Sequence, residues 1–137
     1  MALDVGSKRI GVAIADPTET FALPADTVLR TTLHDDLERL AELFASYNVV
    51  ELVVGDPVAL SGERTLAAQK MDAFVESLRK IFSGTIHLID ERMTTAQVTK
   101  SLIAADVSRK KRKQVVDKMA AALILETFLA RRRLGGS

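Results

Sequence analysis

The sequence predicts an α/β fold in which a mixed five-stranded sheet carries helices on its faces. At the start, two short β-rich runs are joined by the turn Gly6-Ser7-Lys8-Arg9, which is typical of an antiparallel hairpin. Apolar runs then alternate with segments of helical periodicity, and such alternation favours parallel strands. The 137 residues suit one domain, because no Gly/Ser/Pro-rich linker divides them. We therefore treat residues 1–137 as a single domain.

The first expected strands form the hairpin. Residues 1–5 are apolar on both sides of Asp4, and residues 10–15 read IGVAIA before Asp16-Pro17 ends the run. A weaker third strand is expected over residues 25–30. Because a two-stranded hairpin needs further strands or helices to be stable, these segments predict one side of a larger sheet.

Helical spacing begins after residue 30, where leucines recur every three or four residues from Leu33, with Asp35 or Asp36 as the expected cap. Residues 49–54, VVELVV, form an expected buried strand that stops at Gly55-Asp56-Pro57. A loop over residues 61–64 leads into a long amphipathic helix over residues 66–82.

The last expected strand covers residues 86–89 and ends at Asp90-Glu91-Arg92. A short helix over residues 94–103, a basic loop over residues 109–113 and a strongly apolar helix over residues 115–129 complete the chain. These β–α units, placed after the hairpin, predict helices packed on both faces of the mixed sheet.

Composition excludes several classes of protein. The sequence holds no cysteine, which excludes disulfides and Cys-ligated zinc or iron–sulfur centres. Aromatic residues make up 4%, which argues against an extended base-stacking platform. Charged residues interrupt the apolar start of the chain, so nothing resembles a signal peptide or a membrane span. We expect a soluble cytoplasmic protein with no membrane partner.

The net charge of +1 conceals an uneven distribution. Arg109-Lys110-Lys111-Arg112-Lys113 and Arg131-Arg132-Arg133 are basic segments, so the remainder of the chain is acidic. The first segment could neutralise phosphates of a nucleic acid, or it could be a solvated surface. The second is expected to stabilise the carboxyl end of the last helix. His34 and His87 are isolated in the sequence, and we assign neither a role.

Three carboxylates are candidates for chemistry at one end of the sheet. Asp4 lies within an apolar strand, where a buried acid needs compensation, and Gly6 is expected to leave open space beside it. Asp90 and Glu91 end a later strand, and because strand residues alternate in direction, only one of them can join Asp4. Asp117 lies beside the apolar stripe of the last helix. Each also has an ordinary structural interpretation: a turn cap, a solvated loop and a helix-dipole partner respectively.

Converging carboxylates repel one another and need a cation. Hard oxygen ligands favour Mg²⁺ or Mn²⁺, and a pair of such ions supports water attack on a phosphodiester. The pattern therefore predicts a site for two such ions, although the residues alone choose neither Asp90 nor Glu91.

Three motifs resemble the YqgF (RuvX) family. ALDVGSKRIGVAIAD is similar to its Asp-x-Gly-x-Lys-Arg-Ile-Gly-Val-Ala opening, IDERMTTAQV to its Asp-Glu-Arg segment, and SRKKRKQVVDKMAAALILETFL to its basic loop and Asp-x-x-Ala-Ala helix. The resemblance runs from about residue 3 to residue 129. It implies an RNase H-like nuclease domain that is related to Holliday-junction resolvases.

The resemblance also implies a function. It points to a metal-dependent nuclease that processes the 5′ end of pre-16S rRNA during ribosome biogenesis, with nucleic acid and ribosomal particles as partners. It implies Asp4, Glu91 and Asp117 as catalytic and metal-binding residues. Lys8 and Arg9 become substrate-side or structural cations, and the basic run 109–113 becomes a contact for nucleic acid.

The sequence departs from the family at Gly55-Asp56-Pro57, where the family has Gly-Leu-Pro. Asp56 is either an auxiliary acid near the metals or a loop residue without a role in the chemistry. Only three residues precede Asp4, so we expect a longer natural N-terminus. Three alternatives remain: a Holliday junction resolvase, a non-catalytic RNA-binding assembly factor, and an actin-like ATPase, for which the chain is too short. The oligomeric state is left open.

Overall fold

The computed structural model describes residues 1–56, 65–90 and 109–135, with the backbone alone over residues 109–117. Within this part, five strands form a sheet in the order β3-β2-β1-β4-β5. β1 is antiparallel to β2 and parallel to β4. The strands are β1 (Ala2–Val5), β2 (Arg9–Ala15), β3 (Ala22–Leu29), β4 (Glu51–Asp56) and β5 (Thr85–Asp90); the helices are α1 (Leu33–Ser46), α2 (Leu66–Ile81) and α4 (Arg109–Gly135). The predicted mixed five-stranded sheet is confirmed.

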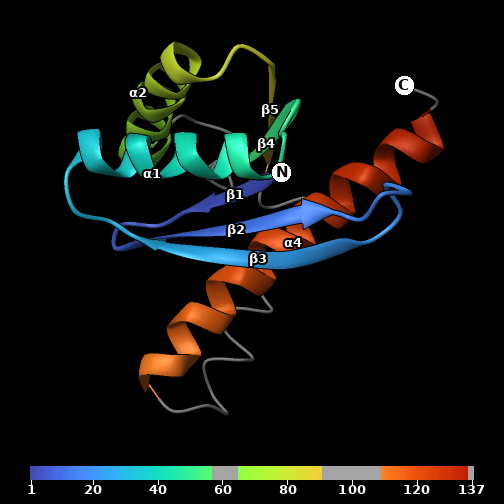
Figure 1. Cartoon of the computed structure of the whole chain (residues 1–137), viewed down its shortest axis with the longest axis horizontal. Coiled ribbons are helices and arrows are strands. Elements are labelled where there is room, and N and C mark those ends of the chain that lie inside the picture. Colours follow the sequence, from blue (N-terminus) through green and yellow to red (C-terminus); the bar gives the residue numbers. More distant parts are fainter. Residues whose placement is uncertain (57–64, 91–108, 136–137) are drawn as a thin grey trace.

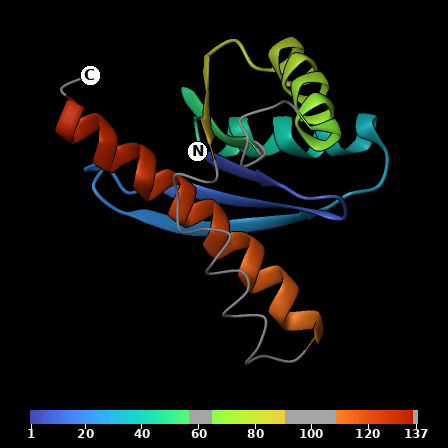
Figure 2. The ribbon, with the colours of Figure 1, turned by 180° about the vertical axis from the view of Figure 1, so that it is seen from behind.

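The helices pack on both faces of the sheet (Figure 1). α1 and α2 cover one face, and α4 crosses the other, as Figure 2 shows from behind. We call them the α1/α2 face and the α4 face. Successive strand residues alternate between them. The α1/α2 face buries Leu3, Val12, Leu52 and Val54 in one apolar cluster, whereas Ala2, Ala13, Val53 and Ile89 pack with Ala120, Ala121 and Ile124 of α4 in the other.

The ends of α1 show how local chemistry sets its limits. Thr32, and not the expected Asp35 or Asp36, caps the helix, because its side chain accepts a hydrogen bond from the Asp35 backbone N–H at 3.1 Å. At the other end Asn48 adopts a positive φ of 51°, and the Val49 N–H donates to the Phe44 carbonyl. This left-handed turn is a common helix stop. Because it extends through Val49, β4 begins at Glu51 and not at the predicted residue 49.

Two further boundaries differ from the predictions. β3 begins at Ala22 and includes Pro24, which an edge strand tolerates because one side of its backbone is unpaired. The basic run 109–113 lies in α4 and not in a loop, and the helix continues beyond the predicted residue 129 to Gly135. Lys and Arg are good helix formers, and no Gly or Pro interrupts the segment before Gly135.

The loop expected over residues 61–64 and the short helix expected over residues 94–103 lie outside the described residues. In the part of the chain that the structure describes, no helix combines the length and the apolar character needed to cross a membrane.

Candidate active site

Asp4 is a buried carboxylate near the carboxyl end of β1. Only 2% of the residue is exposed. It has the same orientation in the strand as Ala2, which packs against α4, so it lies on the α4 face. Gly11 of β2 is its register partner, and Gly55 of β4 follows directly after Val54, the partner of Leu3. Glycines therefore stand beside Asp4 in both neighbouring strands and place no side chain next to its carboxylate.

Gly6 has a different role from the expected one of leaving open space beside Asp4. It lies beyond β1, in the turn to β2, and its N–H donates to the Arg9 carbonyl at 2.8 Å. A Cβ at this position would lie 2.9 Å from that same carbonyl oxygen. Gly6 therefore makes the close turn possible, and Gly11 and Gly55 are the glycines beside the acid. Sequence reasoning missed them because cross-strand register is not visible in a single strand.

The helix that carries Asp117 covers the same face as Asp4. The carboxyl-terminal part of α4 lies by the amino end of β4, where Arg132 binds Glu51. Closer to the amino end of α4, Ala121 is buried against the sheet. Asp117 precedes Ala121 by about one turn, so its backbone lies farther from the amino end of β4. Its side chain lies outside the described residues.

The choice between Asp90 and Glu91 can be examined through the direction of β5. Ile89 packs on the α4 face. Asp90, the next and last residue of the strand, therefore lies on the α1/α2 face, opposite to Asp4. This alternation disfavours Asp90 as a partner of Asp4. Glu91 lies outside the described residues, and its assignment stays a prediction.

Asp56 is the last residue of β4 and is 8% exposed, so its interpretation as a loop residue is wrong. It pairs in register with Asp90, and it shares the orientation of Val54, which packs on the α1/α2 face. The pleat therefore gives no support to Asp56 as an auxiliary acid beside Asp4.

Two of the predicted nucleic-acid contacts are described. Lys8 is exposed in the turn between β1 and β2. Arg9 begins β2, two residues before Gly11, and so lies on the α4 face with Asp4. Its Nε is buried and has no hydrogen-bond partner among the described residues. A buried donor without a partner is costly, and a phosphate oxygen would satisfy it. The side chains of 109–113 lie outside the described residues.

A second polar cluster lies at the other end of the sheet. The Glu51 carboxylate accepts hydrogen bonds from Arg132, whose Nη2 lies 2.5 Å from Oε2, and it lies 2.8 Å from His87 Nε2. The hydrogen bond from Arg132 is the main cause that lowers the pKa of Glu51. The Arg132 guanidinium also lies 4.6 Å from the centre of the Phe128 ring. The cluster fastens α4 to the sheet, which gives His87 and Arg132 structural roles.

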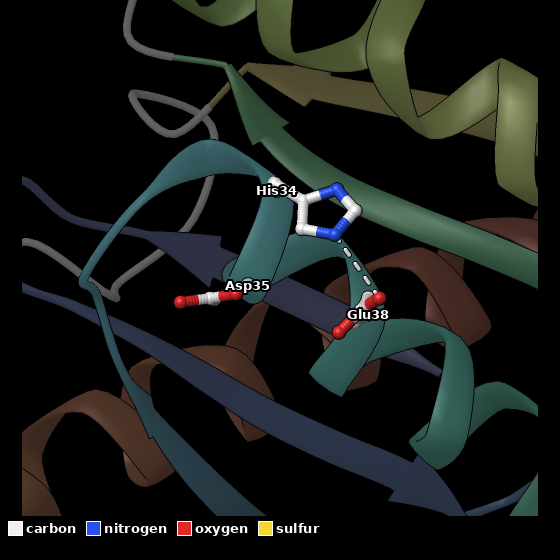
Figure 3. A group of neighbouring side chains, drawn as sticks. All are labelled: His34, Asp35 and Glu38. Atoms are coloured by element: carbon white, nitrogen blue, oxygen red, sulfur yellow. Dashed lines mark ion pairs between the residues drawn. The ribbon is translucent and has the colours of Figure 1, made fainter.

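A third group has donors of the kind that bind metals (Figure 3). His34, Asp35 and Glu38 lie on the first turns of α1, with their donor atoms within 4.8 Å of one another. All three residues are exposed, and His34 Nε2 lies 3.1 Å from Glu38 Oε1 in an ordinary i,i+4 pair. α1 covers the face opposite to Asp4 (Figure 1), so this group cannot complete a site around Asp4.

Comparisons with known proteins agree with the motifs. The family model described as RuvX, Holliday junction resolvase, matches residues 1–131. A protein of Desulforudis audaxviator named "Putative pre-16S rRNA nuclease" is 41% identical over 135 residues, covering 98% of this chain and 96% of the relative. One of the same name from Thermoanaerobacter pseudethanolicus is 45% identical over 130 residues, covering 94% of each chain.

The fold is also similar to a solved structure, that of Thermus thermophilus RuvC in complex with a Holliday junction substrate. The TM-score is 0.59 at 13% identity, and the match covers 97% of this chain and 93% of the other. At this identity the likeness concerns the fold, and it confirms the predicted RNase H-like architecture. The family description and the relatives' names indicate a nuclease, a hydrolase of phosphodiester bonds. The chain belongs to the RuvX family.

Proposed function

We propose that this protein is a metal-dependent nuclease that hydrolyses a phosphodiester bond in the 5′-end processing of pre-16S rRNA. The observation that carries the proposal is the position of Asp4. Its carboxylate is buried near the carboxyl end of β1, on the face covered by the helix that bears Asp117. The relatives named as pre-16S rRNA nucleases, at about 40% identity, supply the substrate. Such a substrate would place the protein in the cytoplasm, in contact with ribosomal particles.

The chemistry of the donors fits a divalent cation. Asp4 supplies a buried carboxylate, and the glycines in both neighbouring strands place no side chain beside it. Glu91 and Asp117 would add two more carboxylates, and such hard oxygen ligands suit Mg²⁺ or Mn²⁺. One or two ions held there would lower the pKa of a bound water and neutralise charge on the phosphate.

The residues of this chain would orient the water, hold the ions and bind the phosphates of the substrate. Asp4 and Asp117 would orient the attacking water, and Glu91 would complete the ligand set. Arg9 lies on the same face as Asp4, and its buried Nε has no hydrogen-bond partner in the part of the chain that the structure describes, so it would donate to an oxygen of the substrate phosphate. Lys8 and the basic segment 109–113 would neutralise neighbouring phosphates, so binding would weaken as salt rises.

The test compares two matched substitutions at strand ends. Asp4→Asn and Asp90→Asn remove the same charge, but the two positions lie on opposite faces of the sheet. With Mn²⁺ or Mg²⁺ and a precursor 16S RNA fragment, we expect Asp4→Asn to lose at least about 100-fold in cleavage rate, because even outer-shell changes at metal sites cost 10–100-fold. Asp90→Asn should stay within a few-fold of the wild type. Cleavage that persists in Asp4→Asn would refute the proposed site.

A second candidate function is Holliday junction resolution, which the family description favours. A four-way DNA junction is therefore the second substrate in the same assay. Metal-dependent cutting of the junction alone would move the function to DNA. Salt-sensitive RNA binding without cutting of either substrate would favour a non-catalytic assembly factor. A dimer in solution would support the resolvase, because junction resolution needs two coordinated cuts.

A further inference from the structure

A cavity of about 450 Å³ opens beside the β1–β2 turn, on the α1/α2 side of the sheet. Its volume falls in the range of about 300–1,000 Å³ that is usual for small-molecule sites. One wall is the turn backbone, and another is the first two turns of α2. The lining combines apolar and cationic groups: Val5, Gly6, Ser7, Arg30, Leu66, Ala67, Lys70, Met71 and Phe74. We call it the turn cavity.

Arg30 is held in place at the edge of the turn cavity. Its Nε lies 3.3 Å from an oxygen of the buried Asp36 carboxylate, and its Nη1 donates to the Gly6 carbonyl at 2.9 Å. The guanidinium also lies 5.3 Å from the centre of the Phe74 ring. Among the described residues, Nη2 makes no hydrogen bond. A fixed guanidinium with donors to spare suits a phosphate oxygen or the face of a base.

Lys70 adds a second cation on the other wall. It is exposed on α2 and pairs with no carboxylate in the described ranges. The first turn of α2 contains no acidic residue, so no nearby carboxylate in that turn opposes an anion. Exposed Leu66 and buried Met71 supply apolar surface between the two cations. Cations that flank apolar surface suit a nucleotide, because the cations can contact its charged phosphate and the apolar surface can contact its flat base.

The turn connects this cavity with the candidate active site. Asp4 lies two residues before Gly6, on the α4 face, and Gly6 lines the turn cavity on the other side. A single strand that passes over the end of the sheet at this turn would meet both faces. The arrangement needs an unpaired strand, because a base within a duplex is stacked and paired with its neighbours.

We propose that the turn cavity binds an unpaired nucleotide that flanks the phosphate cleaved at the Asp4 site. Arg30 and Lys70 contact its phosphate, and the base lies against the apolar wall formed by Leu66 and Met71. This inference rests on the proposed function for the position of the cut, whereas nucleotide binding itself does not depend on cleavage.

The test uses pairs of exposed α2 residues with matched chemistry. Ala67→Phe fills the turn cavity, and Ala73→Phe places the same ring on α2 outside it. Lys70→Gln removes a cavity cation, and Lys80→Gln removes a cation elsewhere on the helix. Binding of a fluorescent single-stranded RNA decamer is measured by anisotropy in EDTA, so that no cutting occurs. A duplex RNA of the same sequence is the second probe.

We expect Ala67→Phe and Lys70→Gln to weaken single-strand binding about five- to tenfold, the effect of losing roughly one stacked base or one phosphate contact. Both control variants should stay within about twofold. Lys70→Gln should also reduce the slope of log affinity against log salt by about 0.7. Equal affinities for Ala67→Phe and Ala73→Phe would overturn the proposal, as would an equal loss of affinity for the duplex.

Cleavage kinetics then separate this inference from the proposed function. If the cavity binds a flanking nucleotide, Ala67→Phe should raise KM with little change in kcat, because the contact is made equally in the ground and transition states. Cavity-dependent RNA binding by a protein that cuts no substrate would refute the cleavage function and leave the nucleotide site intact. Normal cleavage with an unchanged KM in Ala67→Phe would refute the subsite alone.

Discussion

Replacing Glu51 by Gln tests how α4 is fastened to the sheet. The substitution keeps the size of the side chain but removes the charge that faces Arg132 and His87. In the native protein, Arg132 Nη1 and Nη2 lie 3.4 Å and 2.5 Å from the two Glu51 oxygens, and His87 Nε2 lies 2.8 Å from Oε2. The network matters for the candidate site because α4 also carries Asp117.

The expected cost can be worked from this geometry. Two unit charges about 4 Å apart attract by about 4 kcal/mol at an effective dielectric constant of about 20. Desolvation and side-chain ordering offset most of this, and the Glu51 and Arg132 side chains are 38% and 29% exposed. Exposed pairs usually contribute about 0.2–1 kcal/mol. Because this pair is two-pronged and shares a third partner, we expect Glu51→Gln to lower the free energy of unfolding by about 1–2 kcal/mol.

The pH dependence has a definite sign. Hydrogen bonding to Arg132 lowers the pKa of Glu51 below its ordinary value of 4.5. The stabilisation is therefore fully present above pH 4.5 and is lost as the pH falls through the native pKa. Denaturant unfolding of the wild type and Glu51→Gln should show the largest gap near neutral pH. The gap should shrink as the pH falls below 4.5 and through the lowered pKa of Glu51, because the wild-type carboxylate then takes up its proton.

The control is Glu42→Gln, which removes a charge from an exposed pair with Arg39 at 3.2 Å on α1. It should change stability by no more than about 0.5 kcal/mol. A thermal scan should place the midpoint of Glu51→Gln about 3–8 °C below the wild type. A Glu51→Gln variant that is as stable as Glu42→Gln, or a gap that widens in acid, would refute the reasoning.

Two further substitutions test the supports of the turn cavity. Asp36→Asn should lower the free energy of unfolding by about 2–3 kcal/mol, because buried Asp36 binds Arg30 Nε and accepts the Thr31 N–H at 2.9 Å; urea unfolding beside exposed Asp35→Asn measures it, and equal midpoints would contradict it. Gly6→Ala should cost about 1–3 kcal/mol, because the new Cβ would lie 2.9 Å from the Arg9 carbonyl. Thermal unfolding beside Ser7→Ala checks this, and a midpoint equal to that of Ser7→Ala would show that the turn adapts without strain.

The elements could be predicted from the sequence because their signals are local. Apolar runs located the five strands, and helical spacing located α1 and α2. The hairpin followed from the turn at Gly6. The boundaries of the elements were harder to predict where several neighbouring residues could act as the helix cap. Thr32, Asp35 and Asp36 can all cap a helix, and only the structure shows that Thr32 does so while Asp36 is buried against Arg30.

The basic run 109–113 shows a different limit of sequence reasoning. Its five cations carry no apolar periodicity, so the pattern does not distinguish a helix from a loop. The structure continues α4 through the run. Positions on a helix are spaced regularly along one rod. Because five consecutive residues cover more than one turn of a helix, only some of these positions can face one nucleic-acid strand.

The candidate site could be predicted only in part, because it depends on which strands become neighbours. An acid in an apolar strand drew attention to Asp4, but its glycine neighbours Gly11 and Gly55 belong to strands far apart in the sequence. The period of two along β5 separates Asp90 from Glu91 without choosing between them. Ile89, packed on the α4 face, disfavours Asp90, and the assignment of Glu91 stays a prediction.

Because strand residues alternate in direction, this end of the sheet carries the candidate active site on one face and the turn cavity on the other. Asp4 and Arg9 lie on the α4 face, and Arg30, which pairs with Asp36, lines the turn cavity on the other. The Gly6 turn is the short bridge between them, since its backbone contacts both Arg9 and Arg30. A change in this turn would therefore move the candidate metal ligand and the candidate nucleotide cavity relative to each other. A close glycine turn keeps that distance short and fixed, which is what cleavage at one defined position along a strand requires.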